Sequence, residues 1–494
     1  MSKRVFSLVL YFFLSTILFS VPLRIFHTND THGAYQSRRF GSGNNMHTLG
    51  GYLALEQHLT HLRKAAARSV YLDAGDQQTG TVFAALKHKG AVGGAVIEVF
   101  NRLALDGTTY GNHEFDHSLD NLRRLIELAN YPFISTNLLE HESGKPYGGN
   151  PTHIIELDSL KIGIMGLTLS DLAEKVKMEN VKDISILDYR SAIDLYLGDL
   201  DKETDLIILL THIGFEADSL LATQLDDRVD IIIGGHTHTH ITEPRLINGI
   251  YILQAGSYLS HLGYADIEVV DDRVVSFTNA LVPLLTNFPD IGGFISAFVS
   301  EKSMQIEDEL GKVIGVLPFD WIPDKYVETN VSRWMAKALK DEFADPYLPH
   351  IAIINNGGIR KSVPAGKITL KDMHEVLPFN NSVVLFSCTG KDLLTFWELN
   401  NLHKMQRPYD ICQTSAPGWI PEYCKHWHDC DHGWFDMGGY RLEHDAVYRV
   451  VSHDYVLGQW EKYLGFKPFD AYDTGILFLD TMINQVQKQF PIKE

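Results

Sequence analysis

The sequence predicts an α/β protein of at least two domains, and three observations support this. Its 494 residues are enough for two or three domains of ordinary size, and 45% of them are hydrophobic, enough to fill real cores. Between residues 23 and 285, short apolar runs alternate with segments of helical period, which indicates a layered α/β domain. Residues 315–490 contain a further set of helical and strand-like segments, which predicts a second domain.

Four apolar runs in the first domain indicate buried strands that end in polar residues. These runs are LRIFHTND, SVYLDAGDQ, DLIILLTHIG and VDIIIGGHTH. Two other segments, GGYLALEQHLTHLRKAAA and SLDNLRRLIELAN, have helical period. Ligands of α/β sheets collect at the carboxyl ends of the strands, which is where the polar residues fall.

Residues 286–314 predict a helical linker, because the middle of this stretch is amphipathic. The second domain is expected to open with a helix in NVSRWMAKALKDEF. Strand-like segments follow in HIAIINNGG, SVVLFSC and YRVVSHDY.

Residues 1–20 predict a secretory signal peptide, because two basic residues precede an uninterrupted apolar run and Ser20 is a small residue at the cleavage point. A retained N-terminal anchor is the alternative, since the run is close to the length of a short membrane span. We therefore expect an exported protein, either periplasmic, cell-surface or secreted. No later segment is long and apolar enough to span a membrane.

The formal net charge of −19 argues against a surface for nucleic acid or anionic membrane. It is compatible with a small anionic ligand, because a bound cation can reverse the local field.

The four cysteines all lie in the last quarter of the chain. Cys388 stands in a strand-like segment and is expected to be a free core thiol. One disulfide is expected among Cys412, Cys424 and Cys430, although spacing alone does not choose the pair. The alternative is a zinc site in CKHWHDCDH, but its spacing matches no zinc pattern.

Polar residues with metal-binding or acid–base side chains follow five strand or turn segments. They are Asp30, His32, Asp76, Asn112, His113, Asp116, His212, His236 and His238. Taken singly, each could be a helix cap, a turn residue or a hydrogen-bonded loop histidine. Together, oxygen and imidazole ligands beside turn-forming glycines indicate a site for a borderline divalent ion such as zinc or manganese.

With these motifs in this order, the sequence resembles the calcineurin-like metallophosphoesterases, and more closely the exported two-domain 5′-nucleotidase family. The resemblance implies a four-layer α/β/β/α metallophosphoesterase domain, joined by the helical linker to a smaller α+β substrate-binding domain. It also implies two divalent metal ions that share a ligand. One would be held by Asp30, His32, Asp76 and His238, and the other by Asp76, Asn112, His212 and His236.

The implied reaction is hydrolysis of nucleoside 5′-monophosphates by a hydroxide that the two ions hold. The resemblance gives His113, paired with Asp116, the task of stabilising the transition state. The alternative is that His113 only supports Asn112. Glu114 is expected to face solvent or to cap the following helix.

The segments NNGGIRKSVPAGKITL and VLPFNNSV resemble the family's substrate-binding segments. The resemblance implies that Arg360 grips a phosphate or carboxylate-like group beside a loop that contains Asn356 and Gly358. It also implies that Phe379 stacks on a nucleobase and that Asn381 hydrogen-bonds the base. Core packing is the alternative for Phe379.

Two departures from the family keep other substrates open. Lys325 stands where an arginine is common, and the C-terminal glycine-rich segment with a second stacking aromatic is absent, so Trp460 or Tyr463 would replace that aromatic. The alternatives are a nucleotide-sugar or cyclic-nucleotide phosphodiesterase and a thiosulfohydrolase-like hydrolase of sulfur esters. A non-catalytic binding protein with this fold would have lost a metal ligand, and none is missing. The sequence makes no prediction of oligomeric state.

Overall fold

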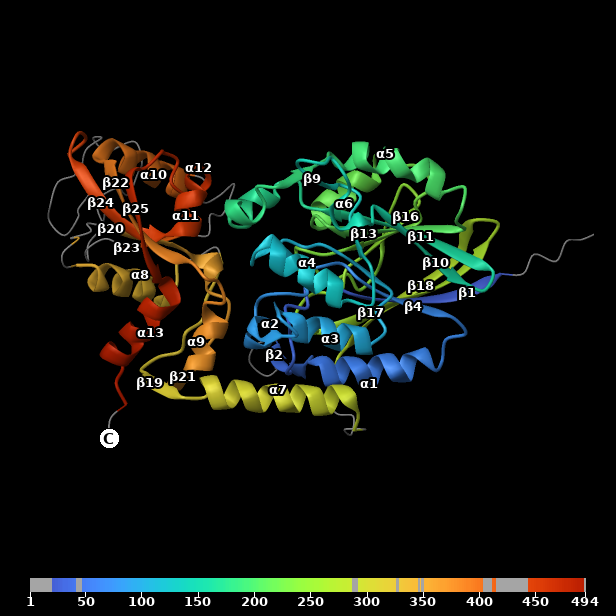
Figure 1. Ribbon diagram of the computed structural model, residues 1–494, viewed down its shortest axis with the longest axis horizontal. Coiled ribbons are helices and arrows are strands. Elements are labelled where there is room, and N and C mark those ends of the chain that lie inside the picture. The colour runs from blue at the N-terminus through green and yellow to red at the C-terminus, as the bar shows by residue number, and fades with distance from the viewer. Residues whose placement is uncertain are drawn as a thin grey trace, which may run out of the picture.

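A computed structural model describes residues 20–40, 47–286, 292–325, 328–344, 347, 351–402, 411–414 and 443–492. Figure 1 shows two domains side by side, the first drawn in blue to green and the second in orange to red. The predicted signal peptide and its alternative, a retained anchor, lie outside the described residues. So do the predicted disulfide and the alternative zinc site, because the side chains concerned are not described.

The first domain is built on two six-stranded sheets. The first sheet has the order β18 (Arg273–Pro283), β17 (His261–Val270), β1 (Val21–Thr28), β4 (Ser69–Asp73), β7 (Gly107–Thr109) and β8 (Phe133–Ile134). The second has the order β10 (Thr152–Leu157), β11 (Leu160–Thr168), β13 (Leu206–His212), β14 (Ile231–Gly234), β16 (Ile250–Leu253) and β15 (Arg245–Ile247). Neighbours from β1 to β8 and from β11 to β16 run parallel.

Helices cover the outer face of each sheet, which makes four layers in the order α/β/β/α. The first sheet is covered by α1 (Tyr52–Arg63), α2 (Val82–Ala85), α3 (Gly94–Arg102) and α4 (Leu119–Leu128). The second sheet is covered by α5 (Tyr189–Leu200) and α6 (Phe215–Ala222). Short pairs of strands complete the domain: β2 (Arg38–Phe40) with β3 (His47–Leu49), β5 (Lys87–His88) with β6 (Ala91–Val92), and β9 (Leu138–Glu140) with β12 (Ile184–Ile186).

Both faces of the central strands are buried, which explains their continuous apolar runs. Successive side chains of a strand point to opposite faces, so Ile25 of β1 packs between the two sheets while Phe26 packs under the helices. On β4, Leu72 packs between the two sheets and Tyr71 packs under the helices. The four strands and two helices predicted for this domain are confirmed, with boundaries that differ by a few residues.

The second domain has a five-stranded sheet with helices on both faces. Its order is β23 (Ile411–Thr414), β20 (Ile351–Asn355), β24 (Val447–His453), β22 (Ser382–Thr389) and β25 (Phe469–Leu477). One face packs on α8 (Asn330–Glu342), α9 (Leu370–Val376) and α13 (Phe478–Gln489). The other packs on α10 (Gly390–Leu402), α11 (Asp454–Gly458) and α12 (Trp460–Tyr463), and the pair β19 (Val313–Leu317) with β21 (Gly366–Thr369) lies beside it.

Helix α7 (Phe294–Leu310) lies in the stretch predicted as a linker and runs along the lower edge of Figure 1 from the first domain to the second. Its buried residues Ile295, Phe298 and Ile306 pack into the core under the first sheet. Cys388 of β22 is a free, buried thiol as predicted, and burial raises its pKa to about 12.

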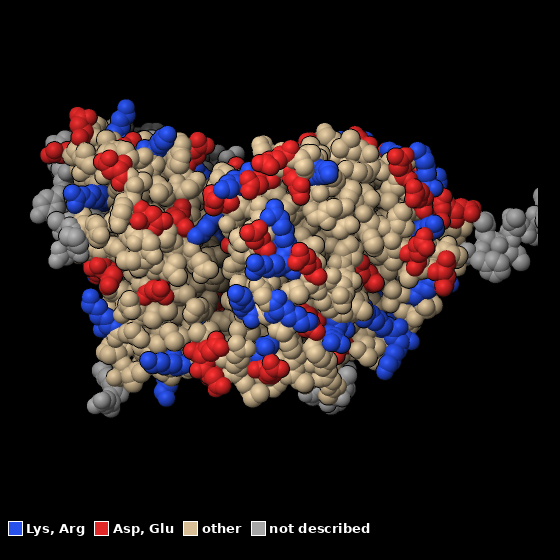
Figure 2. Space-filling view, viewed as in Figure 1, with Lys and Arg blue, Asp and Glu red and all other residues tan. Residues whose placement is uncertain are grey.

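The visible surface mixes both signs of charge. On the face drawn in Figure 2, acidic and basic side chains are interspersed over both domains. Within the part of the chain that the structure describes, every helix is too short or too polar to cross a membrane.

Asp230, just before β14, makes stability depend on pH. Its Oδ2 accepts the N–H of Ile207 at 2.9 Å, and burial raises its pKa from 3.8 to about 7. The folded protein therefore keeps a proton that the unfolded chain releases, so stability falls as pH rises through this interval.

Asp230→Asn should remove this pH-dependent loss of stability, because the amide does not titrate. We expect the unfolding free energy of the variant, relative to wild type, to rise by about 1–2 kcal/mol from about pH 5 to about pH 8, less than a fully buried group would give. Chemical denaturation measures it, and a difference that is constant with pH would contradict the assignment.

Candidate active site

Polar segments follow the carboxyl ends of five parallel strands, β1, β4 and β7 in one sheet and β13 and β14 in the other. The two sheets present these ends at the same side of the domain, so the segments meet. They carry the residues predicted from the sequence: Asp30, His32, Asp76, Asn112, His113, Asp116, His212, His236 and His238.

Five of these residues have a left-handed backbone, which residues other than glycine rarely adopt. Their φ angles are 50° for Asp30, 50° for His32, 56° for Asp76, 76° for His236 and 57° for His238. Each such conformation costs about 1–3 kcal/mol, and this kind of strain concentrates at functional sites. The backbone is therefore shaped to aim these side chains.

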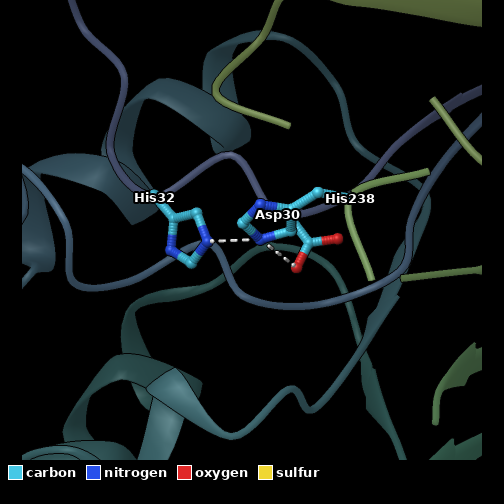
Figure 3. A group of neighbouring side chains, drawn as sticks. All are labelled: Asp30, His32 and His238. Atoms are coloured by element: carbon cyan, nitrogen blue, oxygen red, sulfur yellow. Dashed lines mark hydrogen bonds and ion pairs between the residues drawn. The ribbon is translucent and has the colours of Figure 1, made fainter. Parts of the chain in front are cut away.

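Asp30, His32 and His238 point toward one another (Figure 3). Nε2 of His238 lies 3.3 Å from Oδ1 of Asp30 and 3.3 Å from Nε2 of His32. Asp30 and His32 are fully buried, whereas about a third of the His238 side chain is exposed. The three side chains can offer one ligand atom each to a common metal ion.

Asp76, His212 and His236 form a second group of potential ligands. Nε2 of His212 lies 3.1 Å from Oδ2 of Asp76. Oδ1 of Asn112 lies 3.1 Å from Nδ1 of His236 and so adds an oxygen to the group. Asp76 also belongs to a group with His32 and His113, which places it between the first and second groups.

The donor set fits divalent metal ions. Nδ1 of His212 donates to the carbonyl of Ala74 at 2.7 Å, so Nε2, which lies 3.1 Å from Oδ2 of Asp76, is the nitrogen that can bind a metal ion in place of a proton. Burial lowers the pKa of His212, but the charges on Asp76 and Asp30 raise it by more, so that the net pKa is about 10. The field that favours a proton on His212 equally favours a divalent cation at this position.

His113 and Asp116 form a hydrogen-bonded pair next to these groups. Nδ1 of His113 lies 2.6 Å from Oδ2 of Asp116, and its Nε2 lies 3.9 Å from Oδ2 of Asp76. Burial lowers the pKa of His113, while Asp116 and Asp76 raise it by more, so the net shift is upward. The carboxylate of Asp116 thus orients the ring and favours its charged form.

The prediction for Glu114 is wrong. Its side chain does not face solvent, because the residue is only 2% exposed, and the following helix α4 is capped by Ser118 instead. Its carboxylate accepts backbone N–H groups from Asp76, Gln77, Gln78 and Gly111. Burial and the charge on Asp76 raise the pKa of Glu114 to about 7, and these donors oppose the shift.

A cavity of about 730 Å³ lies between the two domains. The first domain lines it with Asp76, Asn112, His113, Asp116, His236 and His238, and the second with Gly358, Arg360, Phe379, Asn381 and Tyr463, among others. The ring of Phe379 stacks on that of His113 with centroids 5.8 Å apart and planes at 23°. The guanidinium of Arg360 lies 5.8 Å from the Phe379 ring. The cavity therefore joins the polar groups to the second domain.

Two residues predicted to bind substrate do not line this cavity. Asn356 is 1% exposed, and its neighbour Asn355 lines the cavity instead. Trp460 packs against the core on one face of the second sheet, whereas Tyr463, one turn later, reaches the cavity.

Sequence reasoning missed other residues that line the cavity. The ring of Tyr258 lies 4.8 Å from that of His32, and its position soon after buried β16 is a signal that could have found it. Lys177 pairs with Asp454 of the second domain at 2.7 Å and donates to the carbonyl of Asn380 at 2.6 Å. No sequence signal marks Lys177, because its role depends on how the two domains meet.

Comparison with known families agrees with this arrangement. The profile described as calcineurin-like phosphoesterase matches residues 23–240, and the profile described as 5′-nucleotidase, C-terminal domain, matches residues 313–468. The protein thus belongs to the calcineurin-like phosphoesterases, which are a class of hydrolases. More particularly, the chain belongs to the 5′-nucleotidase family and is a 5′-nucleotidase-like phosphoric ester hydrolase.

Individual relatives cover almost the whole chain. A 5′-nucleotidase of Vibrio cholerae is 26% identical over 95% of this chain and 91% of its own length. The crystal structure of a 5′-nucleotidase precursor from Thermus thermophilus matches with a TM-score of 0.80 at 20% identity, over 96% of this chain and 97% of that chain. The sulfate thiohydrolase SoxB of Thermus thermophilus matches with a TM-score of 0.74 at 14% identity, over 95% of this chain and 94% of that chain. These structural matches show a shared fold.

Proposed function

We propose that this protein removes phosphate from nucleoside 5′-monophosphates with the help of two divalent metal ions. The observation that carries the proposal is the pair of ligand groups that meet at Asp76 and border the cavity between the domains. A nucleotide has the chemistry that suits this cavity, because its phosphate would face the metal-binding groups and its base would face the aromatic side of the second domain.

The two groups, with Asp76 added to the first and Asn112 to the second, supply the proposed ligands of the two ions. Asp30, His32, Asp76 and His238 would hold the first ion, and Asp76, Asn112, His212 and His236 the second. Zinc and manganese suit this mixture of oxygen and imidazole ligands. Two such ions, when bound, supply positive charge to the phosphoryl oxygens and make a nucleophile available near neutral pH.

His113 is assigned to the phosphoryl group that is being transferred. Asp116 holds its Nδ1, so Nε2 is the atom that presents a proton to the cavity. A charged imidazole at this position would stabilise negative charge on the phosphate or on the leaving oxygen.

The substrate is held by the second domain in this proposal. Phe379 offers a π face to the base, and Asn381 a hydrogen-bonding amide. Arg360 provides a planar cation for an anionic group, and Gly358 and Tyr463 complete the wall. Since Asn356 and Trp460 lie outside the cavity wall, contact of either with substrate has no support from this geometry.

Export is also proposed, on the basis of the basic residues and apolar run in residues 1–20. We further propose the domain limits 23–285 and 315–490 with a linker at 286–314. The separate cores of the two domains support this division, whereas α7 packs with the first core.

Metal removal should abolish hydrolysis. The purified protein, stripped with a chelator, is expected to lose turnover of AMP and UMP and to regain it with Mn²⁺ or Zn²⁺.

His212→Ala should lower the metal content from about two ions per chain to about one, because it removes a buried ligand. Elemental analysis measures the metal content of the variant.

The substrate panel, in addition to AMP and UMP, contains UDP-glucose, cyclic nucleotides, an organic thiosulfate and an aryl phosphate. Turnover of these without AMP would replace the nucleotide assignment, and no metal-dependent turnover at all would refute the proposal.

His113→Ala should lower kcat by about 10²-fold or more with metal content close to wild type. The expected loss follows from removal of the cation that faces the phosphate. His141→Ala, at an exposed position, is the matched control and should keep full activity. Loss of metal in His113→Ala would instead make His113 a ligand or a support for Asn112.

Phe379→Ala should reduce kcat/KM for AMP by about 10-fold relative to kcat/KM for ribose 5-phosphate, which lacks a base to stack. Phe469→Ala, an exposed aromatic on β25, serves as the control. Equal losses for both substrates, together with lower thermal stability, would show that Phe379 acts in packing alone.

A further inference from the structure

Glu114 is a buried carboxylate that does not line the cavity and is not among the potential metal ligands. Its Oε2 accepts the N–H of Asp76 at 2.9 Å and of Gly111 at 2.7 Å. Its Oε1 accepts the N–H of Gln77 at 2.8 Å and of Gln78 at 3.2 Å. Both oxygens are therefore fully used, and all four partners are backbone donors.

These four donors come from two loops that are in direct contact. The loop after β4 contains Asp76, and the loop after β7 contains Gly111. A Cβ on Gly111 would lie 2.1 Å from Oδ1 of Asp76, and a Cβ on Gly75 would lie 2.6 Å from the nitrogen of Gly111. The loops can approach this closely only because both positions are glycine. The N–H of His113 then donates to Oδ1 of Asp76 at 2.8 Å.

The N–H groups of the loop that carries Asp76 are bound by a side chain from outside the loop. Asp76 has φ of +56°, an unfavourable conformation for an aspartate. In this turn, three consecutive N–H groups, from Asp76 to Gln78, converge on Glu114. Each of these hydrogen bonds contributes about 1 kcal/mol, so together they can offset the strain at Asp76.

We propose that Glu114 is a positioning residue that holds Asp76 between the two ligand groups and so sets metal affinity without binding metal or substrate itself. The inference rests on the proposed function, in which Asp76 is the shared ligand. A residue that only stabilised the fold would lower the unfolding temperature and leave metal affinity in the folded protein unchanged. A positioning residue lowers the affinity in protein that is still folded.

The test is titration of the metal-stripped full chain with Mn²⁺, followed by electron paramagnetic resonance and elemental analysis. In Glu114→Gln, the amide NH₂ replaces an acceptor and faces two N–H donors. We expect Mn²⁺ to bind about 10–100-fold more weakly at one site or both, with altered spin coupling between the bound ions. For AMP, kcat should fall by a similar factor, while KM stays near wild type because the substrate-binding wall is unchanged.

Glu98→Gln is the matched control. Glu98 of α3 is also buried, at 8% exposure, but it pairs with Arg102 of the same helix and with Lys89, away from the site. This variant should lose some thermal stability and bind Mn²⁺ as wild type does. If Glu114→Gln behaves like Glu98→Gln, the inference is overturned.

Two further variants keep the test decisive if Glu114→Gln does not fold. Glu114→Asp keeps the charge but is one carbon too short to reach all four donors. Gly111→Ala leaves Glu114 intact and displaces the Asp76 carboxylate directly. Both should weaken Mn²⁺ binding, and wild-type affinity in a folded Glu114→Asp would overturn the inference. Wild-type protein that binds Mn²⁺ but hydrolyses no ester would refute the proposed function, while the Mn²⁺ titrations would still decide the role of Glu114.

Discussion

Two buried carboxylates, Asp30 and Asp76, lie where the carboxyl ends of both sheets meet, and much of the first domain serves to keep them charged and close together. A buried carboxylate is costly unless positive charge or N–H donors face it. His212 lies 3.1 Å from Asp76 and 3.8 Å from Asp30, and His238 lies 3.3 Å from Asp30. Divalent cations supply the remaining compensation in the proposed function. The left-handed backbone at these positions is the conformational cost of aiming them at one point.

The second domain contributes what this cluster lacks. It brings an aromatic ring, Phe379, against His113 and closes a cavity over the polar groups. The segment around Lys177 joins the domains at this point, since Lys177 pairs with Asp454 and Asn180 donates to the carbonyls of Phe115 and Asp116. The same short segment thus contacts both the second-domain side of the cavity and the backbone that carries Asp116. In the proposed function, this segment links the recognition of substrate physically to the placement of the reacting groups.

The layered fold and the convergence of the polar side chains could be predicted because both follow from local patterns. Apolar runs that end in polar residues mark buried parallel strands, and ligands meet at the carboxyl ends of such strands. Glu114 could not be placed this way. A glutamate in a short polar turn is normally solvated, and its four partners belong partly to a loop 36 or more residues earlier in the chain. Asn356 and Trp460 do not line the cavity, although neighbouring residues do. The local turn of the backbone decides which way each side chain points, and nearness in sequence to a cavity residue does not.

The sequence by itself determined the order of the strands along the chain, the residue types at their ends and the class of chemistry these allow. Those properties depend on side-chain periodicity and on the fixed chemistry of each residue. Only the tertiary structure decided which of these side chains share one point in space, which carboxylate accepts the backbone N–H groups of a loop and which carboxylates belong to the groups of potential metal ligands. The physical reason is that close backbone approach, such as that of Gly75 to Gly111, and burial arise between segments distant in sequence. No local pattern records these contacts.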